Sequence, residues 1–128
     1  MKIAKQDIEV KLEIPGAIIR QATNFGDASG LGKISAEYFS LSAGVDTTPL
    51  FVGLEGNMCQ SPHWGFLMSG QLTSTNAEGT QEVVNANDLF YWPPGHNILV
   101  NQDAEIVMFS PQKEHSHVIN HMIEKIKG

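Results

Sequence analysis

Cysteine and histidine side chains near the middle of the chain have the types and spacing that bind a transition metal. Cys59, the only cysteine, and His63 are four residues apart, so on an extended strand both side chains point to one face of the sheet. A thiolate with one or two imidazoles is a good ligand set for Zn²⁺ and a reasonable one for other late transition metals. The alternative is that Cys59 is a small, buried apolar side chain.

The direction of His63 depends on the register of the strand that follows it. Three large apolar side chains alternate along this strand: Trp64, Phe66 and Met68. If they fill the interior, His63 faces outward, because a shift of one residue exchanges the two faces of a strand. If His63 points inward together with Leu67, this apolar row lies outside and needs a cover, either from the amino-terminal strands or from a second subunit.

Two segments resemble the small single-domain proteins of the cupin superfamily. They read Cys-Gln-Ser-Pro-His-Trp-Gly from Cys59 and Tyr-Trp-Pro-Pro-Gly-His from Tyr91, and the match covers about half of the chain, from Asp46 to Pro111. The resemblance implies a mainly β protein, a cupin-type antiparallel β-barrel of the jelly-roll kind with a small-molecule ligand inside. It also favours the register that turns His63 inward.

The same resemblance provides a third candidate ligand. The first cupin motif has two His and one Glu before a Gly, and counting back from Gly70 puts a different set at these positions: Asn57, Cys59 and His63. In the second motif the His position holds Ile98, and His96 stands two residues earlier. An extended strand places His96 on the same face as Ile98. We therefore expect His96 to reach the metal; the alternative is a turn histidine held by hydrogen bonds.

The expected cofactor is one divalent transition metal bound by Cys59, His63 and His96, with zinc first and iron, nickel or manganese as alternatives. In an enzyme this metal would act as a Lewis acid or activate a bound water or oxygen. The resemblance implies dioxygenation, isomerisation or hydrolysis of small organic acids or sugars, and no pattern marks catalytic residues. The fold alone does not establish catalysis. The rival hypotheses are a metal-free metabolite-binding or sensing module and a structural dimer formed through the outward apolar row.

The elements that position these residues are read from hydrophobic periodicity and turn signals. Short apolar or alternating runs predict strands over 8–14, 17–25, 33–41, 63–69, 71–75, 80–84, 89–92, 97–101 and 104–109. After Ser110, which we expect to act as a cap, helical spacing predicts one amphipathic helix over 111–127. Its histidines, among them His115, His117 and His121, are expected on a solvated face. We expect a single cupin-like domain over 1–128.

Net charge and the distribution of apolar residues limit the classes of binding partner that this protein can have. The formal net charge of −6 disfavours nucleic acid and anionic membranes. The amino end lacks the apolar segment of a signal peptide, and no apolar run approaches the ~20 residues that span a bilayer. We therefore expect a cytoplasmic protein that binds a small molecule and forms a homodimer.

Overall fold

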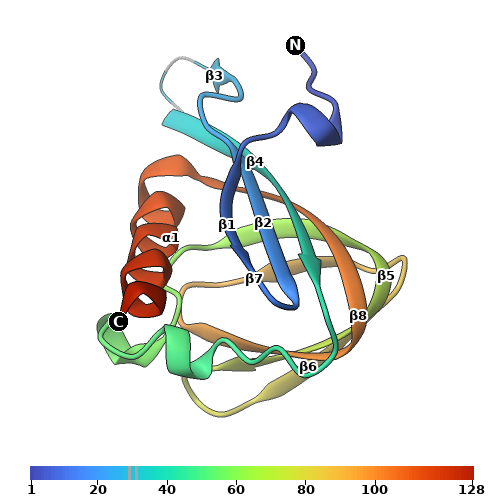
Figure 1. Cartoon of the computed structure of the whole chain (residues 1–128), viewed down its shortest axis with the longest axis vertical. Helices are drawn as coiled ribbons and strands as arrows, with labels where there is room; N and C mark the ends of the chain where they lie inside the picture. Colours follow the sequence, from blue (N-terminus) through green and yellow to red (C-terminus); the bar gives the residue numbers. More distant parts are fainter. Residues whose placement is uncertain (29, 31) are drawn as a thin grey trace.

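The computed structural model describes residues 1–28, 30 and 32–128. Over these residues the chain forms an eight-stranded sheet, three short 3₁₀ turns and one carboxyl-terminal helix (Figure 1). The strands are β1 Val10–Ile14, β2 Ala17–Ala22, β3 Asp27–Ala28, β4 Gly32–Leu41, β5 His63–Asn76, β6 Gln81–Asn85, β7 Leu89–Trp92 and β8 His96–Pro111. The 3₁₀ turns are η1 Lys5–Asp7, η2 Thr48–Leu50 and η3 Glu55–Asn57, and the helix is α1 Gln112–Lys127.

The strands pair antiparallel in the order β1-β2-β4-β8-β5-β6, with β7 paired to β5 and β3 to β4. β5 and β8 run side by side along most of their length, and each joins two runs that the sequence predicts as separate strands. Their register shifts between Leu67 and Leu72. At this bend a Cβ on Gly70 would lie 2.2 Å from the Asp103 carbonyl oxygen, so the close approach of the two strands requires glycine.

The core lies between the β1–β2 side of the rolled sheet and the strands β5, β7 and β8 (Figure 1). Alternation along β5 turns His63 and Leu67 inward, with 2% and 0% of their surface exposed, whereas Trp64 is 51% exposed. This confirms the register in which His63 points into the barrel. The apolar row of Trp64 and Met68 faces outward on the other side of the strand.

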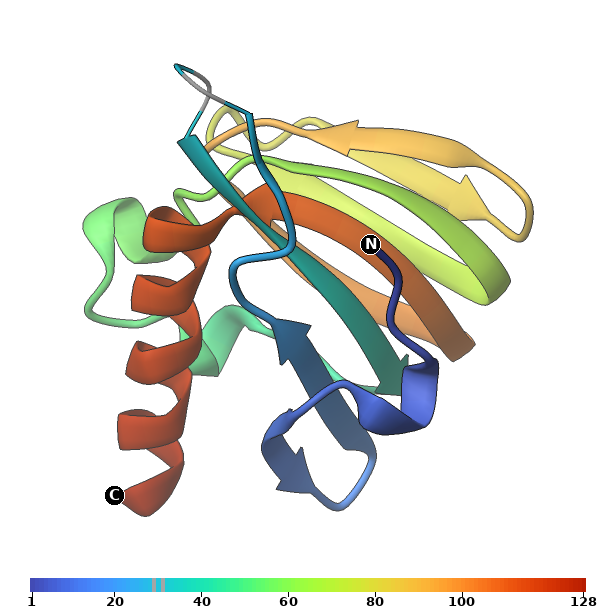
Figure 2. The same ribbon diagram turned by 90° about the horizontal axis from the view of Figure 1, so that it is seen from above.

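Helix α1 lies beside the rolled sheet, close to the η2 turn, and closes one side of the core (Figure 2). Its buried face carries Val118, Ile119 and Met122. The helix begins one residue later than predicted, and Ser110 does not cap it, since Pro111 is the N-cap residue and makes no side-chain cap hydrogen bond. The Ser110 hydroxyl instead donates to a buried carboxylate, described below. Of the described helices, none is long and apolar enough to cross a membrane.

Candidate metal centre

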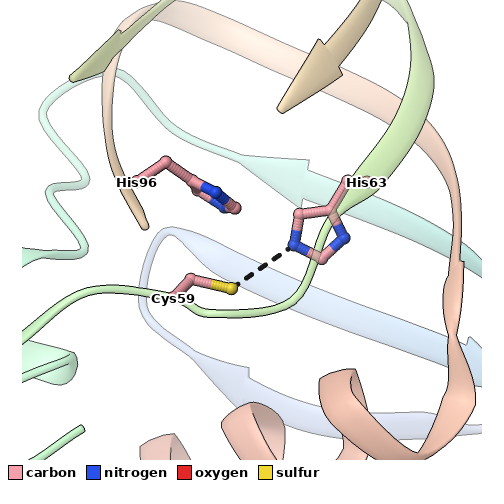
Figure 3. A group of neighbouring side chains, drawn as sticks. All are labelled: Cys59, His63 and His96. Atoms are coloured by element: carbon pink, nitrogen blue, oxygen red, sulfur yellow. Dashed lines mark hydrogen bonds between the residues drawn. The ribbon is translucent and has the colours of Figure 1, made fainter. Parts of the chain in front are cut away.

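Cys59, His63 and His96 converge at one end of the barrel interior, although they belong to different segments. Cys59 and His96 are partners in an isolated antiparallel bridge, in which the Cys59 N–H donates to the His96 carbonyl at 3.0 Å. His63 opens β5 and lies 3.5 Å from the sulfur, measured from Nε2 to Sγ. All three side chains are buried and point toward one another (Figure 3). One ligand atom from each lies within 4.8 Å of the others.

The backbone around the second motif fixes the proton of His96. Its Nδ1 lies 2.8 Å from the Pro93 carbonyl oxygen. A carbonyl can only accept, so Nδ1 carries the proton in the neutral ring and Nε2 keeps a lone pair. Nε2 of His96 is therefore free to bind a metal.

A chain of two short hydrogen bonds fixes the proton of His63 in the same way. The Ser110 hydroxyl donates to Glu37 Oε1 at 2.6 Å, because an ionised carboxylate has no proton to give. Ser110 Oγ is then the acceptor for Nδ1–H of His63, also at 2.6 Å. This leaves the Nε2 lone pair of His63 directed at Cys59. A second partner of this kind is what metal-binding histidines ordinarily have.

Burial keeps both imidazoles uncharged and the thiol protonated in the absence of a cation. Burial lowers the pKa of His63 well below its usual value, and the nearby His115 and His96 rings lower it further. Burial also lowers the pKa of His96 to about 4. Burial raises the pKa of the Cys59 thiol to about 12. A bound divalent cation would reverse the last effect, because a coordinating thiol loses its proton.

Glu37 of β4 is the buried charged centre behind this site. Its Oε1 accepts from Ser110, and its Oε2 accepts from Ser35 at 3.0 Å, from Gln21 at 3.1 Å and from Nδ1 of His115. Four donors thus engage the two carboxylate oxygens, three of them at Oε2. We therefore interpret Glu37 as a hydrogen-bonded support.

The ligand atoms of Glu37, His63 and His115 also lie within 4.8 Å of one another. This second group differs from the first, because the carboxylate is already engaged by protein donors. Nδ1 of His63 is likewise engaged, by Ser110. The first group, with a thiol and two unprotonated Nε2 atoms, has the freer set of ligand atoms.

The expectation of a solvated histidine face on the tail helix is wrong for His115. This ring is 2% exposed and packs against the His63 ring, with 4.2 Å between the centroids. The spacing of His115 to Val118, Ile119 and Met122 places all four on one helical face. This spacing in the sequence could have predicted that His115 is buried. His117 is exposed as expected.

Two other positions from the motif comparison lie outside the group. Asn57 is exposed in η3, where its Oδ1 accepts from the Gly53 N–H at 3.0 Å. The strand begins only at His63, so parity does not carry Asn57 to the interior face. Ile98, at the motif position of a His, lines an internal cavity instead.

This cavity adjoins the three candidate ligands and has a volume of about 60 Å³. Cys59, His63 and His96 form part of its wall, and aliphatic and aromatic side chains from β1, β2, β4, β8 and the segment 45–51 form most of the rest. The Trp92 ring also lines it and meets the His63 ring edge-on at 6.2 Å between centroids. The arrangement places a mainly apolar space directly beside a set of metal-binding atoms.

Comparison with known proteins identifies the fold. No protein-family model matches this chain, and no curated protein matches it either. Among solved structures it resembles oxalate decarboxylases. One, described for its substrate binding mode and a reaction specificity switch, has a TM-score of 0.62 at 19% identity, over 85% of this chain and 28% of that chain. The enzyme from Lactobacillus farciminis, in a formate complex, gives 0.58 at 19% identity, over 85% and 32%.

A Bacillus subtilis oxalate decarboxylase mutant gives a TM-score of 0.59 at 18% identity, again over 85% of this chain and 28% of the other. This chain therefore spans about a third or less of these proteins. At such low identity the likeness concerns the fold alone. It confirms the mainly β, cupin-type barrel with one carboxyl-terminal helix that the sequence predicts.

Proposed function

We propose that this protein binds one divalent transition metal through Sγ of Cys59, Nε2 of His63 and Nε2 of His96, and that the metal holds a small molecule in the adjoining cavity. The observation that carries the proposal is the convergence of three buried ligand atoms within 4.8 Å. The hydrogen bonds to Pro93 and Ser110 support it, since they leave both Nε2 atoms unprotonated. Three protein ligands leave a coordination position for water or a small molecule.

The ligand chemistry narrows the metal to a class. A thiolate with two imidazoles suits late divalent metals, whereas manganese prefers oxygen ligands. Zinc has no support beyond this argument, and the proposal extends to iron, cobalt and nickel. The site needs a reduced thiol, which the cytoplasm maintains, and we propose that the protein works there.

A bound metal would supply Lewis acidity to a molecule at the open position. The chain's own residues orient the ligand rings and exclude water. The second candidate is a metal-free module that binds a metabolite in the same cavity, and the apolar wall of that cavity favours it. The two candidates differ in whether the purified protein binds a metal ion and, if it does, whether the ion is lost when Cys59 or His63 is replaced.

Metal analysis of protein purified without an affinity tag tests the proposal. We expect roughly one ion per chain in the wild type and less than about a tenth of that in Cys59→Ser and in His63→Ala, because loss of a direct ligand exceeds the 10–100-fold effect of losing an outer partner. His117→Ala is the matched control, since that histidine is exposed, and should keep its metal. Circular dichroism establishes that each variant is folded.

A wild type that stays metal-free after dialysis against zinc, cobalt, nickel or iron(II) would contradict the metal site and favour the metal-free module. Full metal content in Cys59→Ser would contradict the assignment of the thiolate. Both outcomes leave the fold intact and concern the ligands alone.

We also propose that the outer face of β7, β5 and β8 is covered by a second copy of this chain. Trp64 is the strand partner of both Tyr91 and Phe109, and these side chains are 51%, 48% and 43% exposed. The Trp64 and Tyr91 rings lie 5.2 Å apart, so the face is a continuous aromatic patch. A two-fold axis would pair this patch with itself and remove it from water.

Sedimentation velocity tests the dimer. We expect a dimer at micromolar concentration and a monomer for Trp64→Glu, because a charge in the centre of an apolar interface lacks a partner. The matched control is Val10→Glu, an exposed valine in β1 at the other edge of the sheet, which should remain a dimer. A monomeric wild type at this concentration would show that the patch is not an interface between copies.

A further inference from the structure

We infer that the cavity beside Cys59, His63 and His96 selects a small, uncharged molecule with an apolar body. The inference rests on the proposed function only for the metal at the polar end of the cavity. It narrows the class of ligand, for which the cupin resemblance implied small organic acids or sugars.

The chemistry of the wall is the first argument. Among the described residues, no Lys, Arg, Asp or Glu lines the cavity. Away from the candidate ligands its polar members are Thr47 and His115, which are already engaged, and Trp92, whose buried Nε1–H has no hydrogen-bond partner among the described residues. The Thr47 hydroxyl accepts from the Ile98 N–H at 2.9 Å, and Nδ1 of His115 donates to Glu37. The apolar body of a ligand would therefore find matching surfaces, whereas added polar groups would find few partners.

The electrostatics of the interior give the second argument. Moving a charged group out of water is unfavourable unless a counter-charge and hydrogen bonds receive it. The nearest buried charge is Glu37, which is negative and lies behind Ser110 and His115. A divalent metal bound to the Cys59 thiolate keeps a single net positive charge, so it could neutralise one negative charge on the ligand, and a second negative charge would stay uncompensated near Glu37. Dianions such as oxalate are thus outside the class that this cavity fits.

The size of the cavity is the third argument. A volume of about 60 Å³ compares with the roughly 10–15 Å³ of such space that one water needs in a cavity. The cavity therefore holds a molecule of a few heavy atoms, and a sugar is too large for it. Apolar cavities of this kind stay dry and take up xenon, which makes xenon a suitable probe.

Methionine methyl groups provide the signal for the experiment. Met108 and Met122 line the cavity, whereas Met1 and Met68 are 93% and 45% exposed. In protein labelled with ¹³C at the methionine methyls, rising xenon pressure should shift the resonances of Met108 and Met122 until they saturate. Those of Met1 and Met68 should move only in proportion to pressure. We expect the same saturable response in metal-free protein, because the apolar wall does not depend on the ion.

Substitution of Ala17, which lines the cavity and is 5% exposed, tests whether the xenon-induced methyl shifts come from xenon bound in this cavity. Ala17→Leu should fill it and abolish the saturable shift. Ala17→Val adds less volume at the same place, should weaken the response, and keeps the test readable if the leucine variant does not fold.

Two results would overturn the inference. One is the absence of a saturable xenon response at Met108 and Met122 in the wild type. The other is a saturable shift of these methyls by sodium oxalate in metal-free protein, whatever the response to xenon, because it would show that the cavity accepts a dianion. Metal analysis separates this inference from the proposed function, since protein that takes up xenon but never binds metal would refute the metal site alone.

Discussion

Replacing Glu37 with alanine is expected to lower the free energy of unfolding by about 3–5 kcal/mol, the range for removing one member of a buried charged pair. The substitution leaves the donors on Ser110, Ser35 and His115 without an acceptor in a space that water does not reach. Each buried donor that loses its acceptor adds its own desolvation penalty. Urea unfolding, monitored by circular dichroism, measures the change.

Glu37→Gln is the matched control, because it keeps the volume of the side chain and one acceptor oxygen for Ser110. Its amide N–H₂ would face the donors that now meet Oε2, so we expect a smaller loss of about 1–3 kcal/mol. This variant also gives a value if Glu37→Ala does not fold. A loss below about 1 kcal/mol for the alanine variant would show that the carboxylate does not organise this side of the core.

The metal-free protein is expected to lose stability as the pH falls below about 6.5, the usual pKa of histidine in an unfolded chain. The pKa of His96 in the folded state is about 4, and that of His63 is lowered further. Between these values the unfolded chain binds protons that the folded chain does not bind. The stabilisation from the neutral rings is therefore complete above pH 6.5 and decreases in acid. His96 alone accounts for roughly 3 kcal/mol by pH 4.

With both rings contributing, the free energy of unfolding should fall by up to about 2.7 kcal/mol per pH unit below pH ~6. Urea midpoints measured from neutral pH down to pH ~5 isolate this effect, since most carboxyls titrate below that window. His96→Gln should reduce the slope by about half, because His63 still contributes, and the exposed His117→Ala should leave it unchanged. A flat profile between pH ~6.5 and ~5 would mean that the rings are solvated.

Residue spacing and the cupin resemblance predict the part of the site that lies close together in the sequence. Cys59 and His63 are four residues apart, and the cupin resemblance favours the inward register of His63, which the alternation alone leaves open and the burial of His63 confirms. The barrel and its terminal helix are also predictable, because period-2 and period-3.6 patterns mark strands and a helix directly. The assignment of these residues as metal ligands remains a prediction.

The support behind the site could not be predicted in the same way. Glu37 and His115 are 78 residues apart, and a charged residue in a strand is ordinarily expected in solvent. Only the folded sheet brings β4 next to β8 and so places Ser110 between Glu37 and His63. The long strands β5 and β8 were likewise divided in the prediction, because the irregular register near Gly70 interrupts the alternation within each of them.

The docking of α1 through His115 has a consequence for the order in which the site is completed during folding. The helix follows every strand of the barrel along the chain, and until it packs against them Glu37 lacks one of its four donors and the His63 ring lacks its neighbour. The three candidate ligands should therefore reach their final arrangement only after α1 has packed against the barrel. A substitution in α1 that loosens the helix would then disturb the site from a distance.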